Sequence, residues 1–141
     1  MSVRENVAKF INKNDNVPLP NVDNIILTEG ASQGVHLILS TMITNQDDAI
    51  LIPIPQYPLY TAAISLNGGT AAPYYMDESS GWQLNFSELE RSIEDAKKKG
   101  KICKSLVVIN PGNPTGSILS EDTIKKILEF SVKNRLVVIA D

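Results

Sequence analysis

Short apolar runs recur along this 141-residue chain, and segments with helical spacing lie between them. A continuous apolar run of strand length indicates a strand buried on both faces, which is typical of parallel sheets. The alternation of such runs with helices predicts an α/β fold, with a mostly parallel sheet flanked by helices. The runs are NIILT (24–28), DAILIP (48–53), TAAPYYM (70–76), KSLVVIN (104–110) and LVVIAD (136–141).

Five segments show helical spacing or helix-start signals. An amphipathic pattern opens the chain from Val3 to Ile11, and an almost all-round apolar pattern from Val35 to Ile43 indicates a largely buried helix. Three more helices are expected to begin near Pro58, Phe86 and Ser120.

The helix near residue 86 carries a further start signal. Asn85 is a candidate N-cap, and Glu88, three residues later, is expected to complete a capping box. We divide the chain into an N-terminal helix and linker, residues 1–24, and an incomplete large domain, residues 25–141. Because the last buried strand stops at the charged Asp141 with nothing to cover it, we expect a fragment of a longer protein.

Composition argues against several classes of partner. The formal net charge of −3 gives no general attraction to nucleic acid. No run approaches the roughly 20 apolar residues of a membrane-spanning helix, and the N-terminus lacks the apolar region of a signal peptide. With a single cysteine, Cys103, and a single histidine, His36, neither an internal disulfide nor a metal site is expected. We predict a cytoplasmic protein, with an organelle as the alternative, and no nucleic-acid or membrane partner.

Each unusual loop of the chain follows a predicted strand. In parallel sheets, ligands bind beyond the carboxyl ends of the strands. The loops TEGASQG (28–34), PIPQYPLY (53–60) and NPGNPTG (110–116), together with Asp141, are therefore expected to lie at one edge.

Two of these loops carry features suited to a flat, phosphorylated ligand. Gly30 and Gly34 bracket the start of a helix, where free N–H groups and the Ser32 hydroxyl can bind an anion. Three prolines restrict the backbone around Tyr57, whose ring is suited to stacking on a heterocycle. A plain helix cap and a tyrosine that packs on its own helix are the alternatives.

The other two positions supply polar groups. Asn113 offers a donor and an acceptor between two prolines, and Asp141 places a carboxylate that can pair with a protonated ring nitrogen. A helix N-cap is the alternative role for Asp141. An anion site, an aromatic plate, an amide and a carboxylate together match a phosphorylated hydroxypyridine, pyridoxal phosphate.

These motifs resemble those of the alanine aminotransferase family, within the fold-type I enzymes that use pyridoxal phosphate. The resemblance rests on TEGASQG, LIPIPQYPLY, YYMDESSGWQLN, VVINPGNPTG and VVIAD, and it covers the whole chain as the N-terminal part of a large domain. It implies exchange of an amino group between L-alanine and 2-oxoglutarate, by a homodimer.

The resemblance also implies residue roles. Ala31, Ser32 and Gln33 would bind the cofactor phosphate, and Tyr57 would stack on the pyridine ring. Asn113 would hydrogen-bond the ring hydroxyl oxygen, Asp141 would pair with the ring nitrogen, and cis peptide bonds would precede Pro55 and Pro114.

Some catalytic parts of the family have no counterpart here. The lysine that forms the Schiff base lies beyond residue 141 in such enzymes, and none of the lysines from Lys97 to Lys133 matches it. The substrate-binding arginine is likewise expected outside this stretch. We therefore expect no catalytic residue in the chain, which alone should be inactive and bind the cofactor weakly. The alternatives are a related aminotransferase or lyase with another amino-acid substrate, and a non-catalytic module that binds phosphate-bearing ligands.

Overall fold

The computed structural model describes residues 2–141, and these fall into two compact units that meet between Gly34 and Val35 in the sequence. That the large domain of the family begins at residue 25 stays a prediction.

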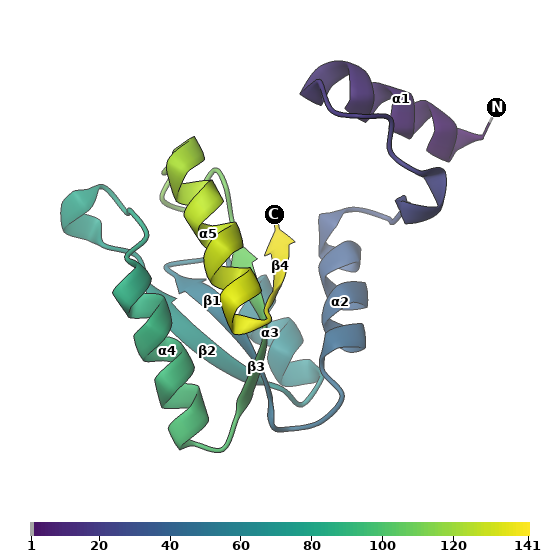
Figure 1. Ribbon diagram of the computed structural model, residues 1–141. Helices are drawn as coiled ribbons and strands as arrows, with labels where there is room; N and C mark the ends of the chain where they lie inside the picture. Colours follow the sequence, from purple (N-terminus) through teal and green to yellow (C-terminus); the bar gives the residue numbers. More distant parts are fainter. Residues whose placement is uncertain (1) are drawn as a thin grey trace. The chain divides into compact units, whose positions relative to one another are not determined.

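The first unit contains helix α1, Val3–Asp15, and a short 3-10 helix, Val22–Asn24 (Figure 1). Helix α1 begins with a full capping box, in which the Ser2 hydroxyl accepts from the Glu5 N–H and the Glu5 carboxylate accepts from the Ser2 N–H. The predicted strand at 24–28 is wrong. Its backbone is extended at Ile25, but residues 25–28 pair with no strand in the part of the chain that the structure describes. An apolar run becomes a strand only where a neighbouring strand accepts its hydrogen bonds.

The second unit is built on a sheet of four parallel strands in the order β2-β1-β3-β4 (Figure 1). The strands are β1 Asp48–Ile54, β2 Thr70–Tyr75, β3 Ile102–Val108 and β4 Val137–Ala140. The α/β fold and the four predicted strands from residue 48 onward are confirmed.

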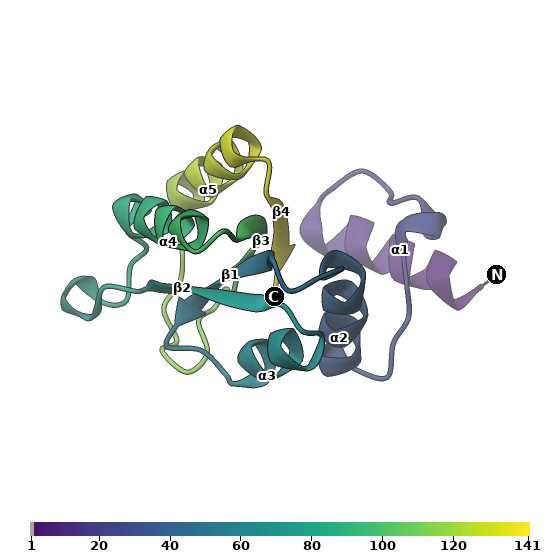
Figure 2. The same ribbon diagram turned by 90° about the horizontal axis from the view of Figure 1, so that it is seen from below.

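Helices cover both faces of this sheet (Figure 2). Helices α4, Phe86–Lys98, and α5, Glu121–Asn134, pack on one face. Helix α3, Leu59–Leu66, and the part of α2, Ala31–Met42, that begins at Val35 pack on the other. Side chains of β1, β2 and β3 alternate between the two cores, as the strand geometry requires.

Strand β1 shows this alternation clearly. Leu51 belongs to the core under α4 and α5, whereas Ile50 and Ile52 belong to the core under α2 and α3. Helix α2 is less buried than expected, because Leu37 and Ile38 are 46% and 43% exposed.

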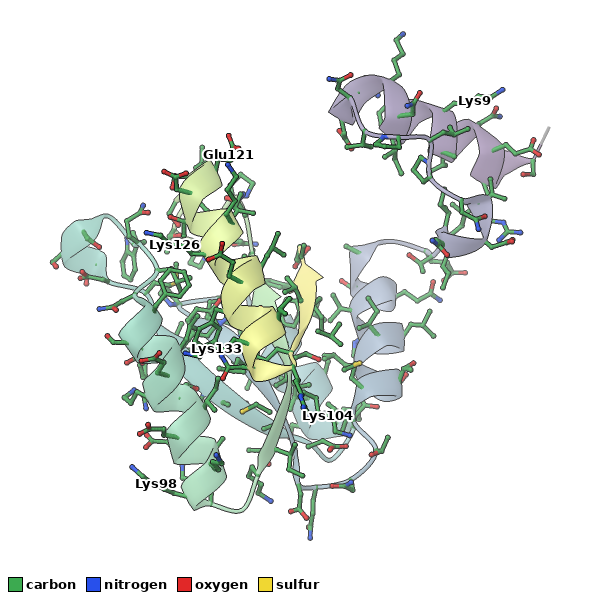
Figure 3. All side chains as sticks on the ribbon, in the orientation of Figure 1. Lys9, Lys98, Lys104, Glu121, Lys126 and Lys133 are labelled. Carbon is green, nitrogen blue, oxygen red and sulfur yellow. The ribbon has the colours of Figure 1, made fainter. Side chains whose placement is uncertain are left out.

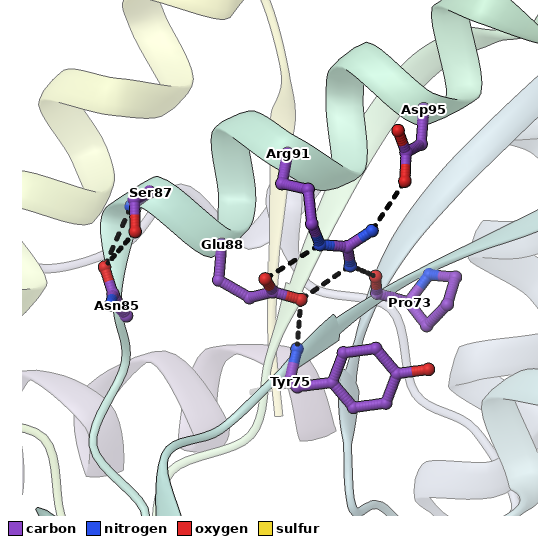
Figure 4. A network of polar contacts seen from close by, with 7 residues as sticks. All are labelled: Pro73, Tyr75, Asn85, Ser87, Glu88, Arg91 and Asp95. Carbon is purple, nitrogen blue, oxygen red and sulfur yellow. Dashed lines mark hydrogen bonds and ion pairs between the residues drawn. The ribbon is translucent and has the colours of Figure 1, made fainter.

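Helix α4 begins at its predicted N-cap, since the Asn85 side chain accepts from the Ser87 N–H. The capping box is wrong, however, because the Glu88 carboxylate accepts from the Tyr75 N–H of β2 and from Arg91 (Figure 4). Arg91 also donates to the Pro73 carbonyl. The free edge of β2 offers unpaired backbone groups, and Glu88 bonds one of these instead of the backbone N–H at the start of its own helix.

Other features of the described residues bear on function. No described helix is long and apolar enough to cross a membrane, and no described group of histidine, cysteine, aspartate or glutamate residues could hold a metal ion. Burial raises the pKa of the Cys103 thiol to about 11, so the thiol is protonated and unreactive at neutral pH.

Candidate functional site

The carboxyl ends of three neighbouring strands form the candidate site in the second unit. Strands β1, β3 and β4 are adjacent and parallel, so the residues that follow them lie at one edge of the sheet. The loop that carries Tyr57 follows β1, the loop that carries Asn113 follows β3, and Asp141 follows β4. The predicted gathering of these three segments at the carboxyl edge is therefore present.

Asp141 is held through both its backbone and its side chain. Its N–H donates to the Val108 carbonyl over 2.9 Å, and its own carbonyl accepts from the Asn110 N–H over 2.8 Å, which extends the pairing of β3 with β4 by one residue. The Tyr60 hydroxyl donates to Asp141 Oδ2 over 2.9 Å. Among the residues described, none donates to the second carboxylate oxygen, Oδ1.

The loop from Ile109 to Leu119 is closed by its own hydrogen bonds. Asn110 Oδ1 accepts from the Leu119 N–H over 3.0 Å, which joins the two ends of the loop. Inside it, the Gly112 N–H donates to the Ser117 carbonyl and the Gly116 N–H donates to the Gly112 carbonyl. These bonds give the loop one defined shape.

Two glycines are required for that shape. A Cβ at Gly112 would overlap the side-chain oxygens of Thr115 and Ser117, and Gly116 has φ +71°. Asn113 lies at an exposed turn between them, and its side-chain amide has no partner in residues 2–141.

The peptide bonds before Pro55 and Pro114 are cis, as the resemblance implied, and the bond before Pro111 is cis as well. Tyr57 is 59% exposed and directly precedes Pro58, the N-cap of α3. The Gln56 amide beside it donates to Thr61 Oγ1 over 2.6 Å, which ties the loop after β1 to the helix. The ring of Tyr57 is thus available to a ligand.

Ala31, Ser32 and Gln33 belong to the first unit, where they form the first turn of α2. Gly30 precedes them with φ +119°. No described residue accepts a hydrogen bond from their three backbone N–H groups. The Gln33 side chain has another partner, because its Oε1 accepts from the Glu29 N–H over 2.6 Å.

Sequence reasoning missed Tyr60. It lies in the quoted PIPQYPLY motif, three residues after Tyr57, but its partner is 81 positions further along the chain. Burial, together with the hydrogen bond to Asp141 and the negative charge of that residue, raises the pKa of Tyr60 well above the usual tyrosine range. The hydroxyl therefore keeps its proton and remains a donor.

An apolar hollow of about 300 Å³ adjoins the site on the α5 side of β4. Its lining includes Leu119, Ile124, Ile127 and Leu128, together with Asn110 and Asp141. The hollow offers few polar groups. By contrast, the Asp141 carboxylate is bonded to Tyr60, which packs in the opposite core under α2 and α3.

The lysines of the second unit lie elsewhere. Lys104 lies on β3, Lys98 on α4, and Lys126 and Lys133 on α5 (Figure 3). The loops after β1 and β3 contain no lysine. The candidate site thus offers groups that can bind and orient a ligand, but no amine.

The groups that this edge does offer suit pyridoxal phosphate in their chemistry. The accessible ring of Tyr57 can stack on a ring face, and the amide of Asn113 can bond a ring hydroxyl. The free oxygen of the Asp141 carboxylate can accept from a ring N–H.

Comparisons with known proteins point to the same cofactor chemistry. The family model for aminotransferase class I and II matches residues 1–141. Alanine aminotransferase 1, mitochondrial, of Arabidopsis thaliana is 49% identical over 140 residues, which cover 99% of this chain and 25% of that protein. Glutamate–glyoxylate aminotransferase 2 of the same plant is 49% identical over 139 residues, or 99% of this chain and 29% of that protein.

Solved structures agree in fold. The alanine aminotransferase of Pyrococcus furiosus superposes with a TM-score of 0.85 at 27% identity, covering 98% of this chain and 33% of that one. The chain thus spans about a quarter of the length of the curated relatives it matches, and its sheet corresponds to part of a fold-type I large domain. The chain belongs to the class I and II aminotransferase family, whose members depend on pyridoxal phosphate.

Proposed function

We propose that this chain supplies part of the cofactor-binding domain of an enzyme that exchanges an amino group between L-alanine and 2-oxoglutarate. The observation that supports this most directly is the position of Asp141 beside the loop that begins at Asn110, at the carboxyl edge that also carries the Tyr57 loop. The similarity to an alanine aminotransferase over nearly the whole chain supports the choice of substrates.

Three residues of the second unit have roles toward the ring of the cofactor. Asp141 accepts from the ring N–H through Oδ1, Asn113 bonds the ring hydroxyl oxygen, and Tyr57 lies against the ring face. When bound, pyridoxal phosphate supplies an electron sink for the pair of electrons left as the amino acid loses its α-proton. The carboxylate of Asp141 favours this by stabilising a positive charge on the ring nitrogen.

Ala31, Ser32 and Gln33 bind the phosphate in this proposal. Their N–H groups begin a helix of 12 residues and have no acceptor among residues 2–141, so they can donate to phosphate oxygens at the positive end of the helix dipole. Gln33 contributes through its backbone, because its side-chain oxygen already accepts from Glu29.

The 141-residue chain by itself is proposed to be inactive and to bind the cofactor weakly. None of its lysines or arginines corresponds to the cofactor lysine or the substrate-binding arginine that the resemblance implies. The substrates of the whole enzyme are an amino acid and a 2-oxo acid. We further propose a homodimer in the cytoplasm; the mitochondrial name of the Arabidopsis relative makes an organelle the alternative compartment.

A second candidate function is transamination between glutamate and glyoxylate. It is favoured by the equal identity, 49%, to a relative of that name. A non-catalytic module that binds phosphate-bearing ligands is the alternative of another class.

One set of assays separates these functions. The protein expressed from its complete reading frame is purified with pyridoxal phosphate and supplied with alanine plus 2-oxoglutarate, or with glutamate plus glyoxylate. Pyruvate formed at a rate at least tenfold above that of the glutamate–glyoxylate reaction supports the proposal. The reverse preference supports the second candidate, and cofactor binding without turnover of either pair supports the module. Sedimentation and cell fractionation of the same protein test the dimer and the compartment.

A further inference from the structure

Tyr60 joins a rigid core to the exposed carboxylate of Asp141. Its ring is 1% exposed and packs with Ile50, Ile52 and Ile64 in the core under α2 and α3. Its hydroxyl leaves that core and donates to Asp141 Oδ2 over 2.9 Å. Packing fixes the Tyr60 hydroxyl, whereas the Asp141 carboxylate lies at an exposed strand end. The hydrogen bond therefore holds the carboxylate in the position that the tyrosine sets.

The other contacts of Asp141 leave its carboxylate little freedom. Its backbone N–H and C=O are bonded to Val108 and Asn110, which fixes the position of the Cα. With Oδ2 held by Tyr60, the direction of Oδ1 is set as well. Oδ1 is then the acceptor that the site presents to a ligand.

The hydroxyl of Tyr60 also remains a donor throughout the physiological pH range. Burial, followed by the bond to Asp141 and its charge, raises the pKa of the phenol well above its ordinary value. The hydroxyl thus remains a neutral donor to the Asp141 carboxylate.

Tyr74 shows that burial alone does not dictate such a partner. Its ring is 2% exposed, in the opposite core, and its hydroxyl donates to the backbone carbonyl of Val107 over 2.7 Å. A backbone carbonyl satisfies a buried hydroxyl without touching any group that can bind a ligand. Tyr60 instead bonds the Asp141 carboxylate at the carboxyl end of β4.

We propose that Tyr60 is a positioning residue, whose hydroxyl holds Asp141 Oδ2 so that Oδ1 is directed at the ring nitrogen of the cofactor. This inference rests on the proposed role of Asp141. In this inference Tyr60 contacts neither substrate nor cofactor, and it affects the cofactor only by positioning the Asp141 carboxylate.

The test uses the protein expressed from its complete reading frame and Tyr60→Phe, which removes one oxygen and keeps the ring. Two properties are measured: the dissociation constant for pyridoxal phosphate, and the ¹⁵N chemical shift of the ring nitrogen of ¹⁵N-labelled cofactor as a function of pH. We expect affinity to fall about tenfold, the order expected for a lost hydrogen bond to a charged group. We also expect the ring nitrogen to lose its proton at a lower pH than in the unmodified protein.

Tyr74→Phe is the matched control, because it removes a buried hydroxyl of the same kind that does not reach Asp141. It should lower thermal stability as Tyr60→Phe does while leaving affinity and the ¹⁵N titration unchanged. Equal effects of the two variants on the cofactor would overturn the inference.

A double-mutant cycle separates positioning from packing. If Tyr60 acts through the carboxylate, Tyr60→Phe has no further effect on affinity in an Asp141→Asn background. An undiminished effect there would contradict the proposal. A measurement on the unmodified protein guards against poor folding of the variants: with ¹³Cζ-labelled tyrosine, cofactor addition should move the Tyr60 signal and not that of Tyr74.

The outcomes distinguish this inference from the proposed function. If the unmodified protein binds no pyridoxal phosphate, the proposed function fails. If it binds and Asp141→Asn weakens binding while Tyr60→Phe does not, the function stands and the role of Tyr60 is rejected.

Discussion

Asp48 and Lys104 form an ion pair across the sheet, with Oδ1 and Nζ 2.9 Å apart and the aspartate side chain only 2% exposed. Asp48 Oδ2 accepts from the Thr44 N–H, the Thr44 hydroxyl and the Asn45 N–H. One carboxylate thus closes the turn between α2 and β1 and joins β1 to β3. Lys104 lies on β3, as Figure 3 shows.

This arrangement predicts acid sensitivity of the second unit. The hydrogen bond from the Thr44 N–H, the largest cause, and those from Lys104 and the Thr44 hydroxyl lower the pKa of Asp48 well below its ordinary value of 3.8, although burial opposes the shift. The stabilisation is therefore fully present above about pH 4 and is lost as the pH falls below that value. Urea unfolding at a series of pH values between 7 and 2.5 measures it.

Asp48→Asn is the control for this pH dependence. The variant should lose about 2 kcal/mol of unfolding free energy at pH 7, since it gives up hydrogen bonds to a charged acceptor. Its stability should then change less with pH below 4 than that of the unmodified chain. If the unfolding free energies of the two proteins changed with pH in parallel, acidic groups other than Asp48 would account for the pH dependence.

The Glu88–Arg91 pair is predicted to protect the free edge of β2. Glu88 and Arg91 satisfy the Tyr75 N–H and the Pro73 carbonyl, two backbone groups of an edge strand (Figure 4). Replacing both residues by alanine exposes those groups, so self-association measured by light scattering should increase. Stability should change by no more than about 1 kcal/mol for a partly exposed pair.

The exposed pair of Lys125 and Glu121 on α5 supplies the matched control. Its double alanine variant removes a similar pair of charges without uncovering a strand. Comparable scattering from both double variants would attribute aggregation to charge loss rather than to the strand edge.

The loop from Ile109 to Leu119 is predicted to depend on Gly116. Alanine at its φ of +71° costs about 1 kcal/mol and disturbs the turn that carries Asn113. Gly81→Ala, at φ +76° in a different turn, should cost a similar amount. In the protein from the complete reading frame, only Gly116→Ala should weaken binding of pyridoxal phosphate, severalfold by equilibrium dialysis. If the two variants bound pyridoxal phosphate with equal affinity, the loop would have no role in cofactor binding.

The apolar face of α5 is predicted to cause self-association of the 141-residue chain. Leu128, which lines the hollow next to β4, and Val132, one helical turn further along α5, are 51% and 79% exposed. Leu128→Lys with Val132→Lys should shift elution in size-exclusion chromatography toward the monomer. Leu66→Lys, at an equally exposed position on α3, should not. Monomeric elution of the unmodified chain would contradict this prediction.

Local patterns were sufficient for most elements of the second unit. The continuous apolar runs from residue 48 onward became strands, Asn85 caps its helix as predicted, and the helix predicted near Ser120 begins there with Ser120 as its cap. These features depend on neighbours in the sequence. The run at 24–28 was misassigned because a strand also needs a partner, and Glu88 was misassigned because its partner, the edge of β2, is formed by residues more than ten positions away.

The α/β class, the loops rich in proline and glycine at Tyr57 and Asn113, and the resemblance that led to pyridoxal phosphate could all be predicted from the residues alone, because short-range periodicity and motif spacing carry that information. The bond of Tyr60 to Asp141 and the bond of Arg91 to the edge of β2 are visible only in the folded chain. Long-range hydrogen bonds form only after the sheet has brought distant segments together, and no local pattern records which buried hydroxyl will meet which carboxylate.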